Sequence, residues 1–316
     1  MGEQAEKWTV GRLLNWTTEF FKGKGIESPL LDAQILLAKA MEIKRIELYT
    51  NFTSEPTESQ RAIFRDFVKR RGAGEPAAYL VGVKEFYSIP FQVNSHVLIP
   101  RPETEQLVLE ALDRLKILAS NYCNDNSESD SNSNSNTNLS MDSISTGSIS
   151  FCDVGTGSGA IAVAVAKNYS RILNSLLITA IDISQDAIEI AKMNAGSAGV
   201  LERINFVQSD LFERVDAMFD IIASNPPYVS CVEYENLPVD IKNYEPKLAL
   251  LAGESGTEVI ERLSLQAFSR VKSGGFFLLE ISPMIAESVK KILIDGGWQN
   301  VRILYDGRVA CCDKLK

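Results

Sequence analysis

Histidine is almost absent from this 316-residue chain, in which His96 is the only one. The five cysteines include no C-x-x-C pair, and an odd number without regular spacing does not suggest a disulfide framework. Zinc sites are built mainly from closely spaced histidine and cysteine ligands, so the sequence predicts no metal site. Cysteines without disulfide spacing are typical of a reducing compartment, and we expect a cytoplasmic protein. We assign His96 no catalytic role.

Long apolar runs and an excess of positive charge are also missing. No stretch approaches the ~18 consecutive apolar residues of a membrane span, and the first ten residues contain no apolar signal core. We therefore expect a soluble protein without a membrane partner. The net charge is −9, from 32 Lys and Arg against 41 Asp and Glu. This balance argues against binding by phosphate neutralisation, and we expect no direct nucleic-acid partner.

The composition of the sequence and the spacing of its apolar residues change along the chain. Residues 1–80 carry apolar side chains at helical spacing, which predicts a small all-helical bundle that binds a partner. Residues 81–100 show short apolar alternation, typical of a hairpin or linker. Residues 101–316 then form a larger α/β domain. Within it, residues 121–150 are dominated by Ser, Asn and Asp, and we expect a disordered insertion there.

After this insertion, strand-like and helix-like segments alternate. Such alternation indicates a Rossmann-like α/β fold with a mostly parallel seven-stranded sheet and helices on both faces. The last two strands follow each other without a helix, so one of them should run antiparallel. The predicted strands are 151–154, 176–181, 204–208, 219–223, 275–281, 301–305 and 308–312.

A glycine-rich loop, Asp153–Gly159, follows the first predicted strand. Its glycines allow a tight turn and close approach to a ligand at the carboxyl edge of the sheet. A dinucleotide site prefers G-x-G-x-x-G with the pyrophosphate on the helix N-terminus. Here an acidic residue precedes G-x-G-x-G, which would oppose a pyrophosphate and suits a cationic ligand such as S-adenosylmethionine. The predicted cofactor residues are Asp153, Gly155, Thr156, Gly157, Ser158 and Gly159.

Two further carboxylates follow the next two strands. Asp182 ends the second strand, where it could accept both ribose hydroxyl protons of either NAD or S-adenosylmethionine. Asp210 follows the third strand and could accept from an adenine amine, with Leu211 or Phe212 against the ring. One such Asp is as often a helix N-cap. Three carboxylates at three successive strand ends favour a nucleoside pocket.

The fourth strand runs into Asn225-Pro226-Pro227-Tyr228. A planar amide or aromatic amine nitrogen is a poor nucleophile because its lone pair is delocalised. The Asn225 side-chain oxygen and the Pro226 carbonyl could accept its two N–H hydrogens, localising that lone pair and aiming it at a methyl donor. Positioning of this kind contributes roughly 7–11 kcal/mol, and the cofactor supplies the hard chemistry.

Each residue of this tetrapeptide has a predicted role. Asn225, Pro226 and Tyr228 are the predicted catalytic residues. All four residues are expected to contact the substrate, with Tyr228 offering a ring face to a flat group and Pro227 helping to fix the backbone. Asn225 is also expected to contact the cofactor.

With these motifs, the chain resembles the release-factor glutamine methyltransferases, the PrmC/HemK family. The N-P-P-Y tetrapeptide is shared with adenine-N6 methyltransferases, whereas the I-P-R-P-E-T-E and Y-E-P segments make the resemblance narrower. The matching segments are Val97–Glu105, Asp153–Gly159, Asp182–Ser184, Ser224–Tyr228 and Tyr244–Leu250.

The resemblance implies a class I methyltransferase fold and S-adenosylmethionine as cofactor. It also implies methylation of the glutamine side-chain amide in the Gly-Gly-Gln motif of class I peptide-chain release factors, by an enzyme that we expect to be monomeric. It assigns Gly155–Gly159, Asp182 and Asn225 to the cofactor. The tryptophan that commonly follows the third-strand Asp in relatives is Leu211 here, and the family's glutamate-glycine-glutamine pattern after the last parallel strand begins at Glu280 but then differs.

Other functions remain open from the sequence. An adenine-N6 nucleic-acid methyltransferase would share the active site but must reach an extruded base, which usually calls for a basic surface. A non-catalytic binding module with a methyltransferase fold and an NAD-dependent dehydrogenase are further alternatives. Arg101 and Glu103 also have two interpretations: a local ion pair, or a loop that closes over the methionine end of the cofactor.

Overall fold

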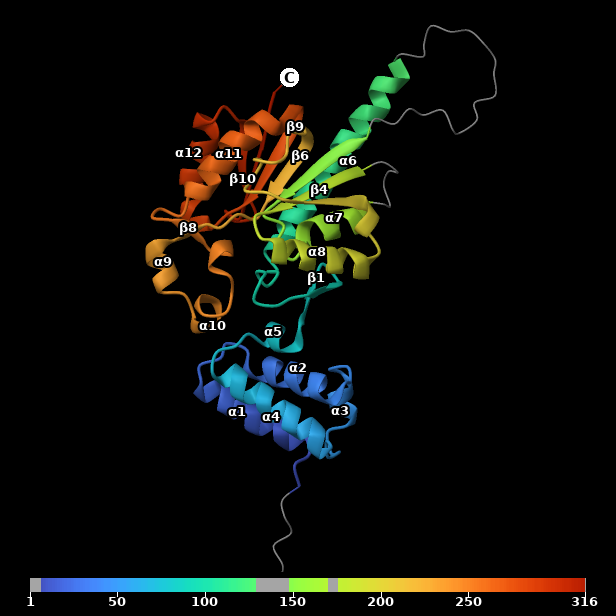
Figure 1. The fold of residues 1–316 in the computed structure, drawn as a ribbon, viewed down its shortest axis with the longest axis vertical. Coiled ribbons are helices and arrows are strands. Elements are labelled where there is room, and N and C mark those ends of the chain that lie inside the picture. Colours follow the sequence, from blue (N-terminus) through green and yellow to red (C-terminus); the bar gives the residue numbers. More distant parts are fainter. Residues whose placement is uncertain (1–6, 129–147, 170–175, 316) are drawn as a thin grey trace, which may run out of the picture. The chain divides into compact units, whose positions relative to one another are not determined.

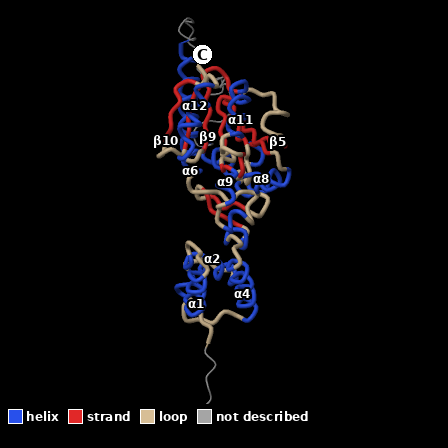
Figure 2. Tube along the Cα trace, turned by 90° about the vertical axis from the view of Figure 1, so that its left-hand side faces the viewer, coloured by secondary structure: helices blue, strands red, loops and turns tan. Residues whose placement is uncertain are grey.

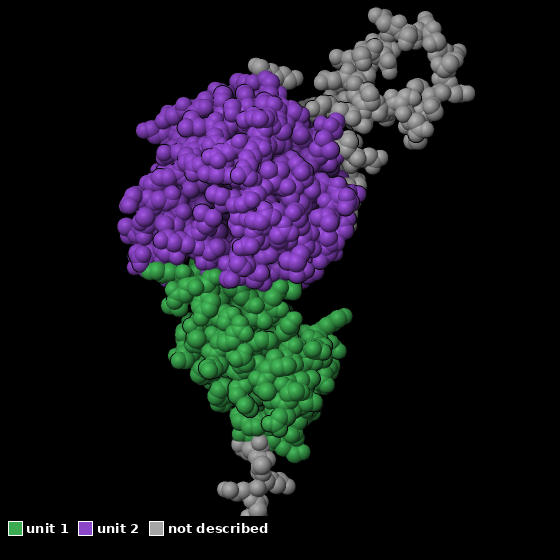
Figure 3. Space-filling view, in the orientation of Figure 1, with its two compact units in different colours: residues 1–83, 238–244 green, residues 84–237, 245–316 purple. Residues whose placement is uncertain are grey.

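The computed structural model describes residues 7–128, 148–169 and 176–315. The chain divides into two compact units, residues 1–83 with 238–244 and residues 84–237 with 245–316 (Figure 3). Each unit is built around its own apolar core. The second unit carries every motif that the sequence analysis linked to chemistry.

The first unit is helical. The Thr9 side chain caps its first helix, and Thr57 forms a capping box with Gln60 at the start of the fourth. Its buried Arg71 lies 2.7 Å from Asp32 and 3.4 Å from Asp240, which ties the segment 238–244 to the bundle. The helices are α1 (Val10–Gly23), α2 (Pro29–Met41), α3 (Glu47–Thr50), α4 (Glu58–Gly72), α5 (Ala77–Val81) and α10 (Val239–Lys242).

The hairpin expected within residues 81–100 is present as β1 (Val83–Phe86) and β2 (Ile89–Gln92). The amide of Asn194 holds β2 in place within the second unit: its Oδ1 accepts from the Gln92 N–H at 2.7 Å, and its Nδ2 donates to the Gln92 carbonyl at 3.1 Å. The hairpin is thus anchored beside helix α8 (Gln185–Ala198).

A sheet forms the centre of the second unit (Figure 1). It has seven strands in the order β10-β11-β9-β6-β3-β4-β5. All seven predicted strands are present, and β11 is the antiparallel one, since it runs opposite to both of its neighbours. The four parallel pairings place the five strands β3, β6, β4, β5 and β9 with their carboxyl ends at one edge. The strands are β3 (Ile149–Val154), β4 (Leu176–Asp182), β5 (Ile204–Gln208), β6 (Phe219–Ser224), β9 (Val271–Glu280), β10 (Gln299–Leu304) and β11 (Val309–Asp313).

Helices cover both faces of this sheet, whose strands are red in Figure 2. Because side chains alternate along a strand, Phe151 packs with the core under α6 and α7, and its neighbour Cys152 packs with the core under α11 and α12. This confirms the predicted α/β architecture. The covering helices are α6 (Thr104–Glu128), α7 (Ala160–Tyr169) and α8 on one face, and α11 (Glu258–Arg270) and α12 (Ala286–Asp295) on the other.

The predicted insertion 121–150 is shorter than expected at both ends. Helix α6 continues to Glu128 and strand β3 begins at Ile149, so both ends of the range belong to regular elements. Residues 129–147 lie outside the described residues. Among the helices that the structure describes, none combines the length and the apolar character needed to span a membrane.

Candidate active site

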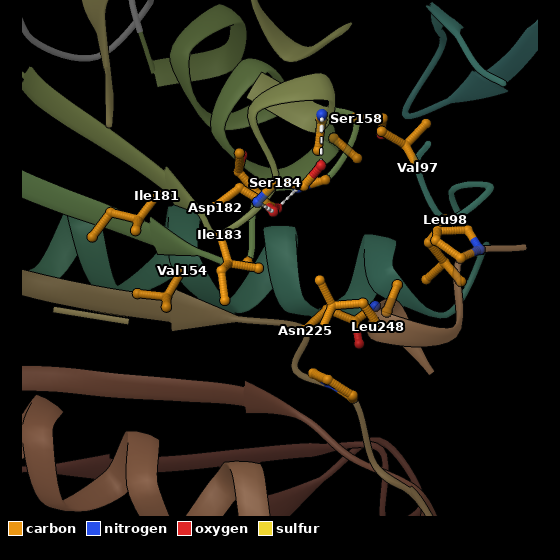
Figure 4. Close-up of a pocket in the computed structure, with 18 of the residues that line it drawn as sticks. Val97, Leu98, Val154, Ser158, Ile181, Asp182, Ile183, Ser184, Asn225 and Leu248 are labelled. Atoms are coloured by element: carbon orange, nitrogen blue, oxygen red, sulfur yellow. Dashed lines mark hydrogen bonds between the residues drawn. The ribbon is translucent and has the colours of Figure 1, made fainter. Parts of the chain in front are cut away.

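A cavity of about 350 Å³ opens at the carboxyl ends of the parallel strands, the edge at which doubly wound folds bind ligands. Its volume lies within the range of small-molecule sites, ~300–1,000 Å³. Figure 4 shows Ser158, Asp182 and Asn225 around it, from the glycine loop, the end of β4 and the segment after β6. The predicted site residues that line it are Gly155, Thr156, Gly157, Ser158, Asp182, Asp210, Leu211, Asn225 and Pro227.

The glycine loop owes its shape to backbone conformations that favour glycine. Gly155 and Gly157 have φ values of 72° and 54°, in the left-handed region. A Cβ atom added at either position would meet no atom within 4 Å, so both backbones border open space. At Gly159, by contrast, a Cβ would lie 3.2 Å from the Ala191 Cβ, because this glycine packs against α8. The loop therefore combines an open side with a tightly packed side.

Asp182 connects the second strand to the glycine loop. Its Oδ2 accepts from the Gly157 N–H at 2.8 Å, and its Oδ1 accepts from the Ser184 N–H at 2.9 Å (Figure 4). Burial raises the pKa of this carboxyl, although the backbone N–H groups act in the opposite direction. Each oxygen keeps further acceptor capacity. Asp182 can therefore hold the loop and accept from a ligand at the same time.

Asp210 forms an ion pair that the sequence did not indicate. Its Oδ2 lies 2.9 Å from Nη2 of Arg262, and both residues line the cavity. Arg262 lies within helix α11, where no motif marks it. Leu211 lines the cavity beside them, whereas Phe212 is buried in the core against Phe219. Of the two apolar residues predicted to cover an adenine ring, only Leu211 is thus in place to do so.

Asp153 lies behind the loop rather than in the cavity lining. Its carboxylate is fully buried; Oδ2 accepts from the Thr156 hydroxyl at 2.6 Å and from the Ala162 N–H at 3.0 Å. Its Oδ1 has no hydrogen-bond partner among the described residues. The sequence predicts this carboxylate beside a cationic ligand. The structure instead gives it contacts that shape the loop and the start of α7.

The stability of the fold should depend on pH through Asp153. Burial raises the pKa of its carboxyl to about 7, so between about pH 4 and pH 7 the folded state holds a proton that the unfolded state has released. The stabilisation is complete below about pH 4 and is lost as the pH rises through about 7. In Asp153→Asn, which cannot ionise, we expect the free energy of unfolding to lack this decrease. Urea unfolding of both proteins across this range measures the difference; parallel pH dependences would contradict the prediction.

The Asn225–Tyr228 tetrapeptide follows β6 directly. The Ser224 hydroxyl donates to the Val154 carbonyl at 2.6 Å, which fixes the end of β6 against the end of β3. Asn225 and Pro227 line the cavity, whereas Pro226 is buried and Tyr228 is half-buried against the apolar core. Burial raises the pKa of Tyr228 to about 12, so its hydroxyl stays protonated. The tetrapeptide therefore presents an amide to the cavity.

Two residues without a predicted role lie beside Asn225. The Asn225 Nδ2 donates to the Thr104 hydroxyl at 3.2 Å. The Thr104 hydroxyl is in turn hydrogen-bonded to Glu280, a buried residue at the end of β9. Thr104 belongs to the I-P-R-P-E-T-E segment and Glu280 to the last parallel strand, so the sequence marks both segments but does not indicate their contact.

Arg101 does not pair with Glu103, so the interpretation as a local ion pair is wrong. Arg101 pairs with the buried Glu245, whose other oxygen accepts from the Ile99 N–H at 3.1 Å. Glu103 instead lies 3.8 Å from Arg308. The I-P-R-P-E-T-E and Y-E-P segments, far apart in the sequence, thus meet through one ion pair between a half-buried arginine and a buried glutamate. Arg101 also lines the cavity, which agrees with the second interpretation of this loop.

Neither metal ligands nor a catalytic histidine emerges from this geometry. Within the ranges that the structure describes, no group of three or more His, Cys, Asp or Glu side chains is placed to hold a metal ion. His96 is at the cavity rim, where its Nδ1 lies 3.3 Å from the Asp186 carboxylate. The polar groups that converge on the cavity include carboxylates, backbone amides, the Asn225 amide and the guanidinium groups of Arg101 and Arg262.

Comparison with known proteins gives the family. The PrmC N-terminal domain model matches residues 12–82, and the methyltransferase small domain model matches residues 129–237. A release factor glutamine methyltransferase from Rhodopirellula baltica is 46% identical, covering 95% of this chain and 93% of its own length. Proteins of the same name from Leptospira interrogans and Chlorobaculum tepidum are 35% and 34% identical, covering 93% and 95% of this chain and 93% and 94% of their own lengths. The matches confirm the predicted methyltransferase fold with a helical first domain, and the chain belongs to the family of release factor glutamine methyltransferases.

Proposed function

We propose that this protein transfers a methyl group from S-adenosylmethionine to the side-chain amide nitrogen of the glutamine in the Gly-Gly-Gln motif of class I peptide-chain release factors. The observation that carries the proposal is the position of Asn225, at the end of β6 and in the lining of the cavity that the glycine loop borders. Membership of a family named for this reaction supports the same substrate.

The residues at the cavity suit S-adenosylmethionine. The open side of Gly155 and Gly157 leaves room for close approach of a ligand, and Asp182 can accept from ribose hydroxyls. Asp210 and Leu211 offer an acceptor and an apolar contact to a base. When bound, this cofactor supplies an electrophilic methyl carbon next to a positive sulfonium. The Arg262 guanidinium neutralises the negative charge of Asp210, so the end of the cavity beside Asp210 does not require a positively charged ligand.

The chain itself supplies orientation rather than acid–base chemistry. The Asn225 side-chain oxygen and the Pro226 carbonyl are the acceptors for the two hydrogens of the substrate amide. Pro226 and Pro227 limit the backbone so that this carbonyl keeps its direction. The ring of Tyr228, held against the core, offers a flat contact to the substrate. Holding the nitrogen in line with the methyl group is the main source of acceleration.

The helical unit is the proposed docking site for the release factor. It exposes large aromatic side chains, among them Trp16 at 53% and Tyr49 at 60%, and Trp16 stacks on Phe20 with ring centroids 5.5 Å apart. Exposed aromatic clusters are typical of protein interfaces. We further propose that the enzyme acts as a cytoplasmic monomer, without a nucleic-acid or membrane partner.

Replacing Trp16 with alanine tests this docking role. The KM for an intact release factor should rise about 10-fold or more, as expected for an aromatic anchor, and the KM for a short Gly-Gly-Gln peptide should not change. Leu265→Ala is the control, because Leu265 is 68% exposed on α11 in the other unit. Steady-state kinetics with both substrates measures the effect. An equal rise for the protein and the peptide would assign Trp16 to the fold instead of to docking.

The reaction itself is tested by mass spectrometry of an intact release factor incubated with enzyme and S-adenosylmethionine. The expected result is one added methyl group on the glutamine of Gly-Gly-Gln. A parallel reaction with DNA and RNA and a labelled methyl donor addresses the adenine-N6 alternative. Label only in nucleic acid, or no transfer to any of these substrates, would overturn the proposal.

A further inference from the structure

Three segments that are distant in the sequence meet beside the substrate end of the cavity. Asn225 follows β6 and Glu280 ends the neighbouring β9, where Ser224 pairs with Leu279, so the two residues are next to each other in register. Thr104 begins helix α6, which packs across these strands. Thr104 and Glu280 belong to regular elements and Asn225 directly follows one; all three lie in one unit, and Thr104 and Glu280 are buried.

The hydrogen bonds among these side chains have a direction. A threonine hydroxyl has one hydrogen to donate. That hydrogen is directed to the Glu280 carboxyl, because the bond from Thr104 lowers the pKa of this group, as a donor to its ionised form does. The Thr104 oxygen is then left to accept from the Asn225 Nδ2, at 3.2 Å. With Nδ2 turned toward Thr104, the Asn225 oxygen is the end of the amide left for another partner.

The alternative direction would be unproductive. If the Thr104 hydroxyl donated to the Asn225 oxygen, the amide would turn over and present its NH₂ group to the cavity. A substrate amide nitrogen also carries hydrogens, so two donors would then face each other. The direction of the hydrogen bonds that begin at Glu280 therefore decides whether Asn225 can act as an acceptor.

We propose that Glu280 and Thr104 are positioning residues for methyl transfer: the Glu280 carboxylate orients the Thr104 hydroxyl, which orients the Asn225 amide with its oxygen toward the substrate nitrogen. The electrostatics of Glu280 agree with this role. Burial raises the pKa of the Glu280 carboxyl to about 7, whereas the bond from Thr104 lowers it, as a donor to the ionised form does. Its Oε2 has no hydrogen-bond partner in the described part of the chain, and the Thr104 hydroxyl donates to this carboxyl.

The inference rests on the proposed function and is tested first by kinetics with an intact release factor. Thr104→Val keeps the shape of the side chain but removes the hydroxyl, and it should lower kcat about 10- to 100-fold with little change in the Kd for S-adenosylmethionine. Thr104→Ser restores a hydroxyl and should keep kcat within about threefold of the wild type. Thr179→Val on β4 is the matched control. A normal kcat in Thr104→Val, or an equal loss in Thr104→Ser, would refute the positioning role.

A double-mutant cycle separates positioning from direct contact with the substrate. The Glu280→Gln amide can donate to the Thr104 oxygen and reverse the direction of the bonds, so kcat should fall in this variant too. If Glu280 acts only through Thr104, the double variant should be no slower than Thr104→Val by more than about threefold. Fully multiplied losses would show that Glu280 acts on the substrate directly and would overturn the proposal.

A measurement on the free enzyme tests the orientation of the Asn225 amide independently of which substrate is methylated. In an NMR spectrum of side-chain amides, the Asn225 NH₂ signal is identified by its loss in Asn225→Asp. Its two proton shifts should differ strongly in the wild type, because one hydrogen is bonded to Thr104, and the difference should shrink in Thr104→Val. An unchanged signal would refute the orientation of Asn225 whatever the substrate. A wild-type enzyme that modifies no release factor would instead refute the proposed function alone.

Discussion

Asn225→Ala is expected to lower kcat about 10³-fold, the largest effect of any single substitution in this protein. The side-chain oxygen is one of two proposed acceptors for the substrate amide, and removal of one oriented polar group at a reacting centre typically reduces kcat by 10²- to 10³-fold. Loss of alignment adds to this. The fold should be spared, because Asn225 is only half-buried and its side chain contributes, among the described residues, one hydrogen bond, to Thr104.

The measurement is single-turnover methylation of a release factor, together with the thermal midpoint and the Kd for S-adenosylmethionine. Asn205→Ala is a suitable control, since Asn205 is exposed on β5. We expect Asn205→Ala to match the wild type and Asn225→Ala to keep its thermal midpoint within a few degrees. Unchanged turnover in Asn225→Ala would contradict the mechanism, and the non-catalytic alternative would gain support if the wild type were equally slow.

The sheet could be predicted closely because its signals are local. Each parallel strand is a short apolar run, and a glycine, proline or carboxylate lies at or just after its end, as it does after Val154 and after Ser224. Such strand ends can be predicted from neighbouring residues alone. The end of α6 was harder. Its last residues, up to Glu128, are polar and lie in the Ser/Asn-rich stretch, so their composition suggested disorder although the helix continues through them.

The site residues likewise divide into those that the local sequence predicts and those that it does not. The glycine loop, Asp182 and Asn225 follow strands directly, so their shared location at one sheet edge could be inferred from the order of the strands. The pairs Arg101–Glu245 and Asp210–Arg262 join residues from separate elements, and helix packing decides which side chains meet. The position of Asp153 behind the loop was also unpredictable, because a sequence does not show toward which side of a turn a carboxylate points.

Asp182→Ala is expected to have the second largest effect, a rise of more than about 100-fold in the Kd for S-adenosylmethionine. A hydrogen bond to a charged group contributes ~1.5–3 kcal/mol. Loss of both proposed ribose contacts therefore costs at least about 3 kcal/mol, which corresponds to slightly more than a 100-fold change in Kd. The kcat at saturating cofactor should fall only a few-fold, because the proposed contacts of Asp182 are with the ribose and not with the reacting methyl group.

Calorimetric titration of Asp182→Ala and of Asp182→Asn gives the sharper result. Asparagine is usually a conservative replacement, but the two Asp182 oxygens accept from Gly157 and Ser184 N–H groups at 2.8 and 2.9 Å. An amide offers only one oxygen, so its NH₂ group would face a backbone N–H, and Asp182→Asn should bind the cofactor nearly as weakly as Asp182→Ala. Asp186→Ala, with a carboxylate 69% exposed on α8, should bind normally. Normal affinity in Asp182→Asn would contradict the prediction. It would show that cofactor binding requires neither the hydrogen bond from the glycine loop to this carboxylate nor the carboxylate as an acceptor.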